Sequence, residues 1–416
     1  MILLPMMILP HFWKTSKAKN SEVIIRATPT VSCGEVLLYN VVDKEFQSAL
    51  RPLALMQRLF ICAKFSIRDN FIASNTATYN YIGLSCALIF RSFMLYYLIS
   101  TINQMIGITS LLSLCDIDDF IFFSVGFIIN YYSNIIQCNN NVFLILKLQN
   151  VIRSLQIDVK VMKFFVITNW CYIIALNCVF ILSNTYYCMF HVVGNAWDHL
   201  SSFTSITFDI NIVYASFILS LLRRLVISWI EEFQSNGDSN NECYWNAMFD
   251  LYVNILEAYK LLKITSSLQV VYYTIHTVCH GLMTEVILLQ MRHIIPETQV
   301  KFTMFAMLSQ MWLVKNVALQ IVLCVKSERF YAAMEQVPSV CVELMQTRGC
   351  TALMKLVGPL FTDKQRQVCK NIQRLHETSF KKMSGFGLFV VDVALPLRIA
   401  SVLTSYTLAI LQFALS

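Results

Sequence analysis

A line of polar side chains runs along the apolar C-terminal stretch of the chain, which ends SYTLAILQFALS. Four positions share one face of a helix because they recur at spacings of four, three and four: Ser401, Ser405, Leu408 and Gln412. An unpaired polar group in lipid is costly, so this face must meet water, protein or a lumen. Two interpretations stay open at this point. The face lines a water-filled pathway, or Gln412 is solvated at the membrane surface.

Ionisable residues also stand inside other apolar stretches, where such groups usually pair or serve function. Asp209 and Glu285 lie near one end of their stretches, and Arg91 and Lys315 lie deeper. Glu285 and Lys315 differ in depth by about 10 Å at 1.5 Å per residue, so we expect no direct bridge between them. These residues either form structural pairs or contribute to a binding site.

A small-molecule site is usually an apolar pocket with a few convergent polar groups. Aromatic residues stand at depths similar to those of the ionisable groups. The sequence therefore predicts a ligand pocket in the outer half of the bundle, with these residues in or beside it: Phe123, Trp170, Asp209, Tyr214, Glu285 and Trp312.

Other arrangements that could carry chemistry are weak. His276 and His280 share a helical face beside Cys279, but no third metal ligand is apparent, so we expect no metal and no cofactor. No P-loop and no G-x-S-x-G motif occurs, and the seven His are scattered, which argues against an enzyme. A transporter should show two related halves or broken helices, and neither is visible. A disulfide between Cys115 and Cys188 stays open.

The composition predicts an all-α, polytopic membrane protein. The chain of 416 residues is 56% hydrophobic and only 14% charged, which is too little polar surface for a globule in water. A spanning helix needs about 20 largely apolar residues. Seven stretches qualify: 79–100, 117–136, 161–184, 205–229, 265–290, 303–325 and 394–416. The amphipathic stretch 47–66 predicts a helix at the inner membrane surface.

The distribution of Lys and Arg fixes the expected orientation. Nine precede the first span, and three, two and ten lie in alternate connections, whereas the opposite connections hold two in total. Cytoplasmic loops carry the excess of basic residues. We therefore expect an intracellular N-terminus and an extracellular C-terminus, which excludes a G-protein-coupled receptor.

Four regions follow from this layout. Residues 1–78 form a cytoplasmic N-terminal region with the interfacial helix, and 79–325 form a six-span bundle with an outer ligand pocket. Residues 326–393 form a cytoplasmic helical collar, built from inner extensions of the sixth and seventh helices. Residues 394–416 form the seventh helix. The segment 231–246 is rich in Asn, Ser and Gly and predicts a loop.

The last helix resembles that of the insect gustatory receptors. Those receptors end with Thr-Tyr, five apolar residues and Gln-Phe, and this chain has Ser405, Tyr406, residues 407–411, Gln412 and Phe413. The departures are Ser405 in place of Thr, and Thr407 among the apolar positions. The Glu that sugar-sensing members tend to carry after the Tyr is absent, which favours bitter or other non-sugar ligands. Insect odorant receptors share the layout but do not usually keep Gln-Phe.

This resemblance implies a ligand-gated, weakly selective cation channel in the plasma membrane of a sensory neuron. Its partners would be a small-molecule tastant, the lipid bilayer and related subunits in a homo- or hetero-tetramer, with no nucleic acid. The seventh helices would surround a central pore, with Phe413 as a hydrophobic constriction. The alternatives are an insect odorant receptor subunit and, in another class, a membrane enzyme or transporter.

Overall fold

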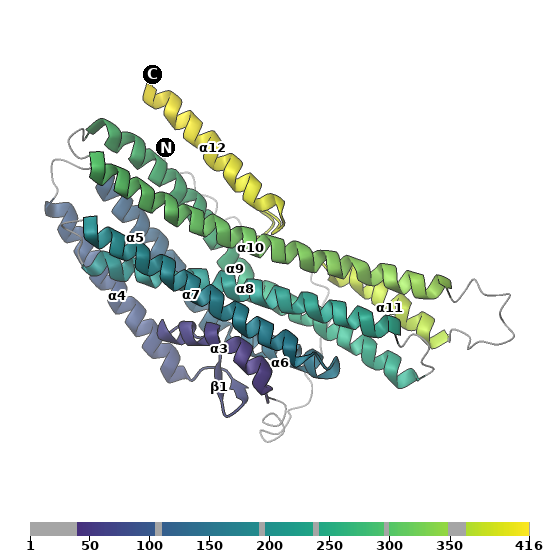
Figure 1. Cartoon of the computed structure of the whole chain (residues 1–416). Coiled ribbons are helices and arrows are strands. Elements are labelled where there is room, and N and C mark those ends of the chain that lie inside the picture. The colour runs from purple at the N-terminus through teal and green to yellow at the C-terminus, as the bar shows by residue number, and fades with distance from the viewer. Residues whose placement is uncertain are drawn as a thin grey trace, which may run out of the picture. The chain divides into compact units, whose positions relative to one another are not determined.

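The computed structural model describes residues 40–104, 110–190, 196–235, 241–294, 299–347 and 363–415, most of which are helical (Figure 1). The compact unit that starts at Val42 holds the elements that follow. In chain order these are α3 (Lys44–Leu59), β1 (Ser66–Arg68), β2 (Phe71–Ala73), α4 (Ala77–Gln104), α5 (Ser110–Tyr131), η2 (Tyr132–Ile136), α6 (Cys138–Ser154), α7 (Val159–Phe190), α8 (Ala196–Ser235), α9 (Glu242–Ile294), α10 (Gln299–Thr347), α11 (Asp363–Ser379) and α12 (Ala394–Leu415).

Helix α8 forms the centre of the packing. It contacts α7, α9 and α10, and α9 in turn contacts α5, α6, α11 and α12. The most apolar window of α8 is 78% buried, against 11% for α4, 22% for α7 and 11% for α12. A helix that is apolar all round belongs in a core, whereas an apolar helix left uncovered needs lipid or another protein. The all-α fold class is thus confirmed, and α4, α7 and α12 are the peripheral helices.

Four helices in the described ranges are long and apolar enough to cross a membrane: Ala77–Ser100, Val159–Ser183, Ser205–Ser235 and Ala394–Gln412. A fifth span is available if Phe120–Ile136 and Cys138–Ser154, which are bent by 57° at their junction, count as one. The predicted spans 265–290 and 303–325 fall within α9 and α10, whose described residues do not reach that apolarity. The count of seven and the orientation of the termini stay predictions.

The predicted helix 47–66 is wrong in its bounds. Helix α3 ends at Leu59, because Ile61 has a φ of 53°, which a right-handed helix does not admit. A short hairpin follows, in which β1 pairs antiparallel with β2. Its turn residues Asp69 and Asn70 have φ values of 48° and 69°, typical of a two-residue type I′ turn. The buried side of α3 packs on α7 and α8.

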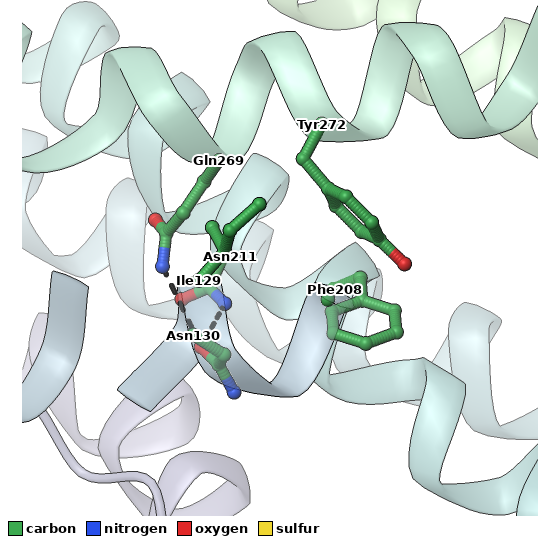
Figure 2. A pocket seen from close by; sticks show the side chains of 7 residues that line it. Ile129, Asn130, Phe208, Asn211, Gln269 and Tyr272 are labelled. Atoms are coloured by element: carbon green, nitrogen blue, oxygen red, sulfur yellow. Dashed lines mark hydrogen bonds between the residues drawn. The ribbon is translucent and has the colours of Figure 1, made fainter. Parts of the chain in front are cut away.

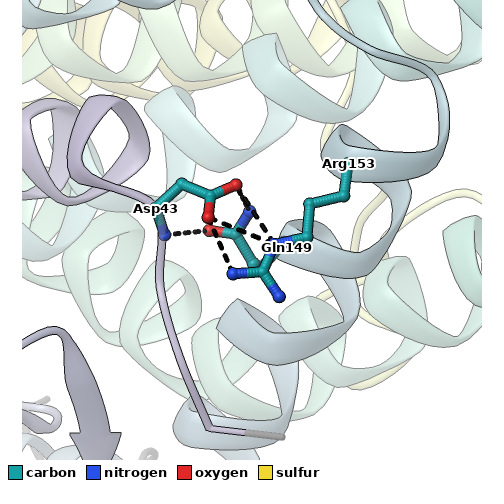
Figure 3. A network of polar contacts seen from close by, with 3 residues as sticks. All are labelled: Asp43, Gln149 and Arg153. Carbon is teal, nitrogen blue, oxygen red and sulfur yellow. Dashed lines mark hydrogen bonds and ion pairs between the residues drawn. The ribbon is translucent and has the colours of Figure 1, made fainter.

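A polar cluster fixes the start of α3 on α6 (Figure 3). The backbone N–H of Asp43 donates to Gln149 Oε1 at 2.9 Å, and Gln149 Nε2 donates back to Asp43 Oδ2 at 2.6 Å. Arg153 Nη2 donates to Asp43 Oδ1 at 2.7 Å. These hydrogen bonds from Arg153 lower the pKa of Asp43, against the effect of its partial burial.

The collar predicted at 326–393 is helical, but one of its predicted connections is wrong. Helix α10 continues the sixth stretch without a break to Thr347. Helix α11 is not an extension of α12, because a turn separates them: Ser384 and Val390 form an isolated antiparallel bridge. Phe386 and Gly387 at the tip have φ values of 50° and 79°, so no helix passes through them. The loop predicted at 231–246 is shorter, since α8 reaches Ser235 and α9 begins at Glu242.

Candidate functional site

Helix α12 is capped at its start and held to its own chain by one face. Asp392 Oδ1 accepts hydrogen bonds from two N–H groups of the first turn, at 3.0 and 3.2 Å. Leu395 and Ile399 are buried, and Leu403 lies against α9 at Gly281, where an added Cβ would stand 3.1 Å from Leu403 Cδ2. The face that carries 395, 399 and 403 is therefore the inward face of α12.

The predicted pore-lining residues stand on the uncovered side of this helix. Four of them are exposed in the single chain: Ser401, Ser405, Leu408 and Gln412. Tyr406, the remaining residue of the C-terminal motif with a described side chain, is 57% exposed, so the uncovered arc is wider than the polar stripe. The side chain of Phe413 lies outside the described residues. This face is free to meet other copies of α12 or a lumen, and its role as a pore lining stays a prediction.

Asp209, predicted near the ligand pocket, belongs to a buried ion pair. Lys315 Nζ on α10 lies 2.5 Å from Asp209 Oδ2 on α8. Tyr273 on α9 donates to the other carboxylate oxygen, Oδ1, at 2.8 Å, and Asn316 Oδ1 lies 3.0 Å from the same hydroxyl. Both oxygens of Asp209 are thus occupied by groups from two neighbouring helices, so the pair ties α8, α9 and α10 together.

Glu285 has a polar partner of its own. Gln310 Nε2 donates to Glu285 Oε1 at 2.7 Å, which joins α9 to α10. The other carboxylate oxygen, Oε2, takes no part in this hydrogen bond.

An aromatic cluster brings two of the predicted residues together. The ring centroid of His276 lies 5.8 Å from that of Phe123 and 5.2 Å from that of Trp312. His280 stands 4.2 Å from Trp312, and Trp312 lies 5.5 Å below Lys315 Nζ. The two His therefore line an aromatic wall. Among the described residues no group of three His, Cys, Asp or Glu could hold a metal.

Two predicted ligand residues lie elsewhere. Trp170 on α7 is 37% exposed on the outer side of the bundle. Tyr214 is buried on α8, with Lys64 Nζ 5.1 Å from its ring centroid. Sequence depth alone placed them with the cluster, but depth does not say which side of a helix a residue occupies.

A buried amide network beside the cluster was missed by the sequence reasoning (Figure 2). Figure 2 shows Asn211 Nδ2 donating to Asn130 Oδ1 at 2.8 Å, with Gln269 Nε2 at 3.5 Å from the same oxygen. Asn134, outside that view, donates from Nδ2 to Asn130 Oδ1 at 2.5 Å and accepts from Gln269 Nε2 at 3.2 Å. Lys64 Nζ donates to Asn134 Oδ1 at 2.6 Å. Burial lowers the pKa of Lys64 to about 7. The spacing of Asn130 and Asn134, four residues apart in an apolar run, is the signal that could have found it.

A small cavity lies between this amide network and the rings of Phe208 and Tyr272. Its walls are Gly126, Ile129, Asn130, Phe208, Asn211, Gln269 and Tyr272, and its volume of about 10 Å³ is close to the minimum for one water molecule. Gly126 permits this approach of helices, because a Cβ there would stand 2.3 Å from Tyr272 Oη. The binding of a larger molecule at this point requires the surrounding rings to move.

Solved structures share this arrangement, among them that of an insect receptor. The insect olfactory receptor OR5 from Machilis hrabei superimposes with a TM-score of 0.54 and 14% sequence identity, over 89% of this chain and 100% of that one. No family model and no curated protein matches the sequence. At this identity the likeness shows the fold: the chain has the fold of an insect olfactory receptor, and its apolar helices are those of a multi-pass membrane protein.

Proposed function

We propose that the chain is a subunit of an insect chemoreceptor that acts as a ligand-gated, weakly selective cation channel. The observation that carries the proposal is the exposed polar face of α12. A capped, apolar helix with Ser405 and Gln412 facing outward ends a chain with the fold of an insect olfactory receptor. Such a face is costly in lipid and is satisfied in a lumen.

Four copies of α12 around an axis would make that lumen, in a homo- or hetero-tetramer at the plasma membrane of a sensory neuron. Ser401, Ser405, Leu408 and Gln412 line it, and Phe413 forms the constriction. A ring of uncharged amides lets water and monovalent cations pass without the selectivity of a charged ring. The inward face at 395, 399 and 403 links pore movements to α9.

The ligand is a small-molecule tastant, bitter or otherwise not a sugar. It binds in the outer part of the bundle, where Phe123 and Trp312 belong to an aromatic wall and Glu285 supplies a carboxylate. Asp209 contributes by holding Lys315 in place. An odorant receptor subunit is the second candidate, favoured by the fold neighbour, whereas the Gln412-Phe413 ending favours the gustatory kind.

Recording currents from cells that express this chain, against bitter compounds, sugars and odorants, tests the proposal. We expect a non-selective cation current with at least one non-sugar compound. Gln412→Glu should raise the permeability ratio of cations to anions and strengthen block by large cations, and Gln412→Ala should weaken discrimination.

The matched control is Gln346→Glu, which makes the same change at an exposed position of α10 outside the pore helix. Unchanged permeation in both Gln412 variants at normal surface density would place Gln412 outside the pore.

A further inference from the structure

Arg91 holds two N–H groups of its guanidinium inside the bundle with no hydrogen-bond partner among the described residues. Its Nε and Nη2 atoms are buried and make no hydrogen bond to the described part of the chain, and no ion pair to Arg91 occurs there. Arg91 lies 14 residues after the start of α4 and 13 before its end. At 1.5 Å per residue it is about 20 Å from either end of the helix. The cation therefore stands midway through the expected span.

Three phenylalanine rings surround this cation. The guanidinium carbon lies 4.4 Å from the ring centroid of Phe127, 5.3 Å from that of Phe90 and 5.7 Å from that of Phe123. Cation–π contacts strengthen when the cation is removed from water. Ring faces are only weak acceptors for N–H groups, so the buried N–H groups of Arg91 keep their demand for an oxygen acceptor.

The two unsatisfied donors define the shape of the missing acceptor. Nε–H and Nη2–H point side by side from one edge of the group, which is the fork that binds both oxygens of a carboxylate. The two carboxylates discussed above have other partners than Arg91: Asp209 bonds to Lys315 and Tyr273, and Glu285 bonds to Gln310. An external anion with two oxygens satisfies this edge.

The surroundings select the rest of the ligand. The rings lead from Arg91 into the bundle: Phe127 packs on Phe208 at 5.7 Å, and Phe208 on Tyr272 at 5.2 Å, where the cavity of Figure 2 begins. On the other side, Leu88 and Ile89 of α4 are 58% and 70% exposed on an apolar face. In a bilayer this face would contact lipid, and it lies within one helical turn of Arg91 in the chain.

We propose that Arg91 reads the carboxylate of an amphipathic carboxylic acid, whose apolar chain lies among Phe123, Phe127 and Phe208. The inference goes beyond the proposed function, because it adds a site for a second ligand class at mid-span, below the outer part of the bundle, with Phe123 common to both. A phospholipid offers an anionic group too, but its headgroup belongs at the membrane surface, about 20 Å from this depth. The mid-span position therefore favours a single-chain acid.

Photoaffinity labelling tests the site without relying on channel activity. The full chain is purified into nanodiscs of neutral phosphatidylcholine and labelled with a long-chain carboxylic acid that carries a diazirine. We expect the label in peptides of α4 or α5, and we expect the parent acid to compete with it. The primary amide of that acid has the same shape without the charge and should compete at least tenfold less effectively.

Variants assign the labelling to the guanidinium. Arg91→Gln should reduce labelling about tenfold, and Arg91→Lys, which keeps the charge and loses the fork, should lie between. Lys163→Gln removes an exposed cation from α7 and should label as the parent chain does. If Arg91→Gln does not fold, Arg91→Lys and the acid-against-amide competition decide the question.

Three results would overturn the inference. If the amide competes as well as the acid, or if folded Arg91→Gln labels normally, aromatic rings alone hold Arg91. Alternatively, added phosphatidic acid displaces the probe more strongly than the free acid, and the site then reads a lipid headgroup. Labelling that behaves as expected in a chain that carries no current with any ligand would refute the channel and leave the acid site standing.

Discussion

Asp209 and Lys315 hold opposite charges in a place where neither is tolerated alone. Their carboxylate and ammonium side chains are only 4% and 16% exposed. Removing one partner of a buried ion pair leaves the other uncompensated and costs about 3–5 kcal/mol. We therefore expect Asp209→Asn to lower the melting temperature of the purified protein sharply, and the double variant Asp209→Asn/Lys315→Gln to recover most of the loss.

A surface pair provides the control for this prediction. Lys147 Nζ lies 2.7 Å from Glu257 Oε2, but the two side chains are 37% and 49% exposed. Exposed pairs contribute about 0–1 kcal/mol, so Glu257→Gln should change the melting temperature little. If Asp209→Asn changes the melting temperature as little as Glu257→Gln does, Asp209 is solvated and available to a ligand.

At the scale of elements, α11 is held to α9 by a contact that depends on pH. Tyr252 Oη on α9 shares a hydrogen bond of 2.7 Å with His376 Nδ1, and Phe380 lies against the same imidazole ring at 5.0 Å. Burial lowers the pKa of His376 below its ordinary 6.5, although Glu335 and Glu377 act in the opposite direction. The folded collar thus prefers the neutral imidazole.

Acidification should consequently loosen α11. The folded state binds fewer protons than the unfolded chain between the two pKa values of His376, so stability rises with pH there. The contribution is complete above about pH 6.5 and is lost as the pH falls through the lower pKa of the folded form. Protection factors for the amides of 363–379, which correct for the slower intrinsic exchange at low pH, should fall between pH 7.5 and 5.5, and His376→Gln should abolish that dependence. An equal fall in the variant would assign the effect to other groups.

The sequence predicted the helices that a local hydrophobic pattern determines. Long apolar runs and basic connections place α4, α7, α8 and α12, because a spanning helix is a local property of about 20 residues. The end of α3 and the break before α12 depend instead on single left-handed residues, Ile61 and Phe386, which no hydrophobic pattern reveals. The partners of Asp209 and Arg91 depend on how helices rotate against one another, which only tertiary packing fixes.

At the scale of the whole molecule, the single chain leaves its last helix largely uncovered. Only 11% of the apolar window of α12 is buried, although the helix is anchored by Leu395, Ile399 and Leu403. A helix with polar groups on an uncovered face is satisfied by copies of itself around water. The proposed assembly would cover the exposed side of α12. The opposite side, with Leu395, Ile399 and Leu403, already packs on the same chain.

Cysteine substitution should separate those two sides. In a ring of four subunits Gln412→Cys brings equivalent thiols near the axis, so a mild oxidant should link chains into dimers on a denaturing gel. Leu403→Cys faces α9 of its own chain, where Gly281 stands, and should not cross-link. Dimers from Leu403→Cys and none from Gln412→Cys would turn α12 around, put the polar stripe against the chain's own bundle or lipid, and leave the SYTLAILQF ending as a packing element rather than the wall of a pore.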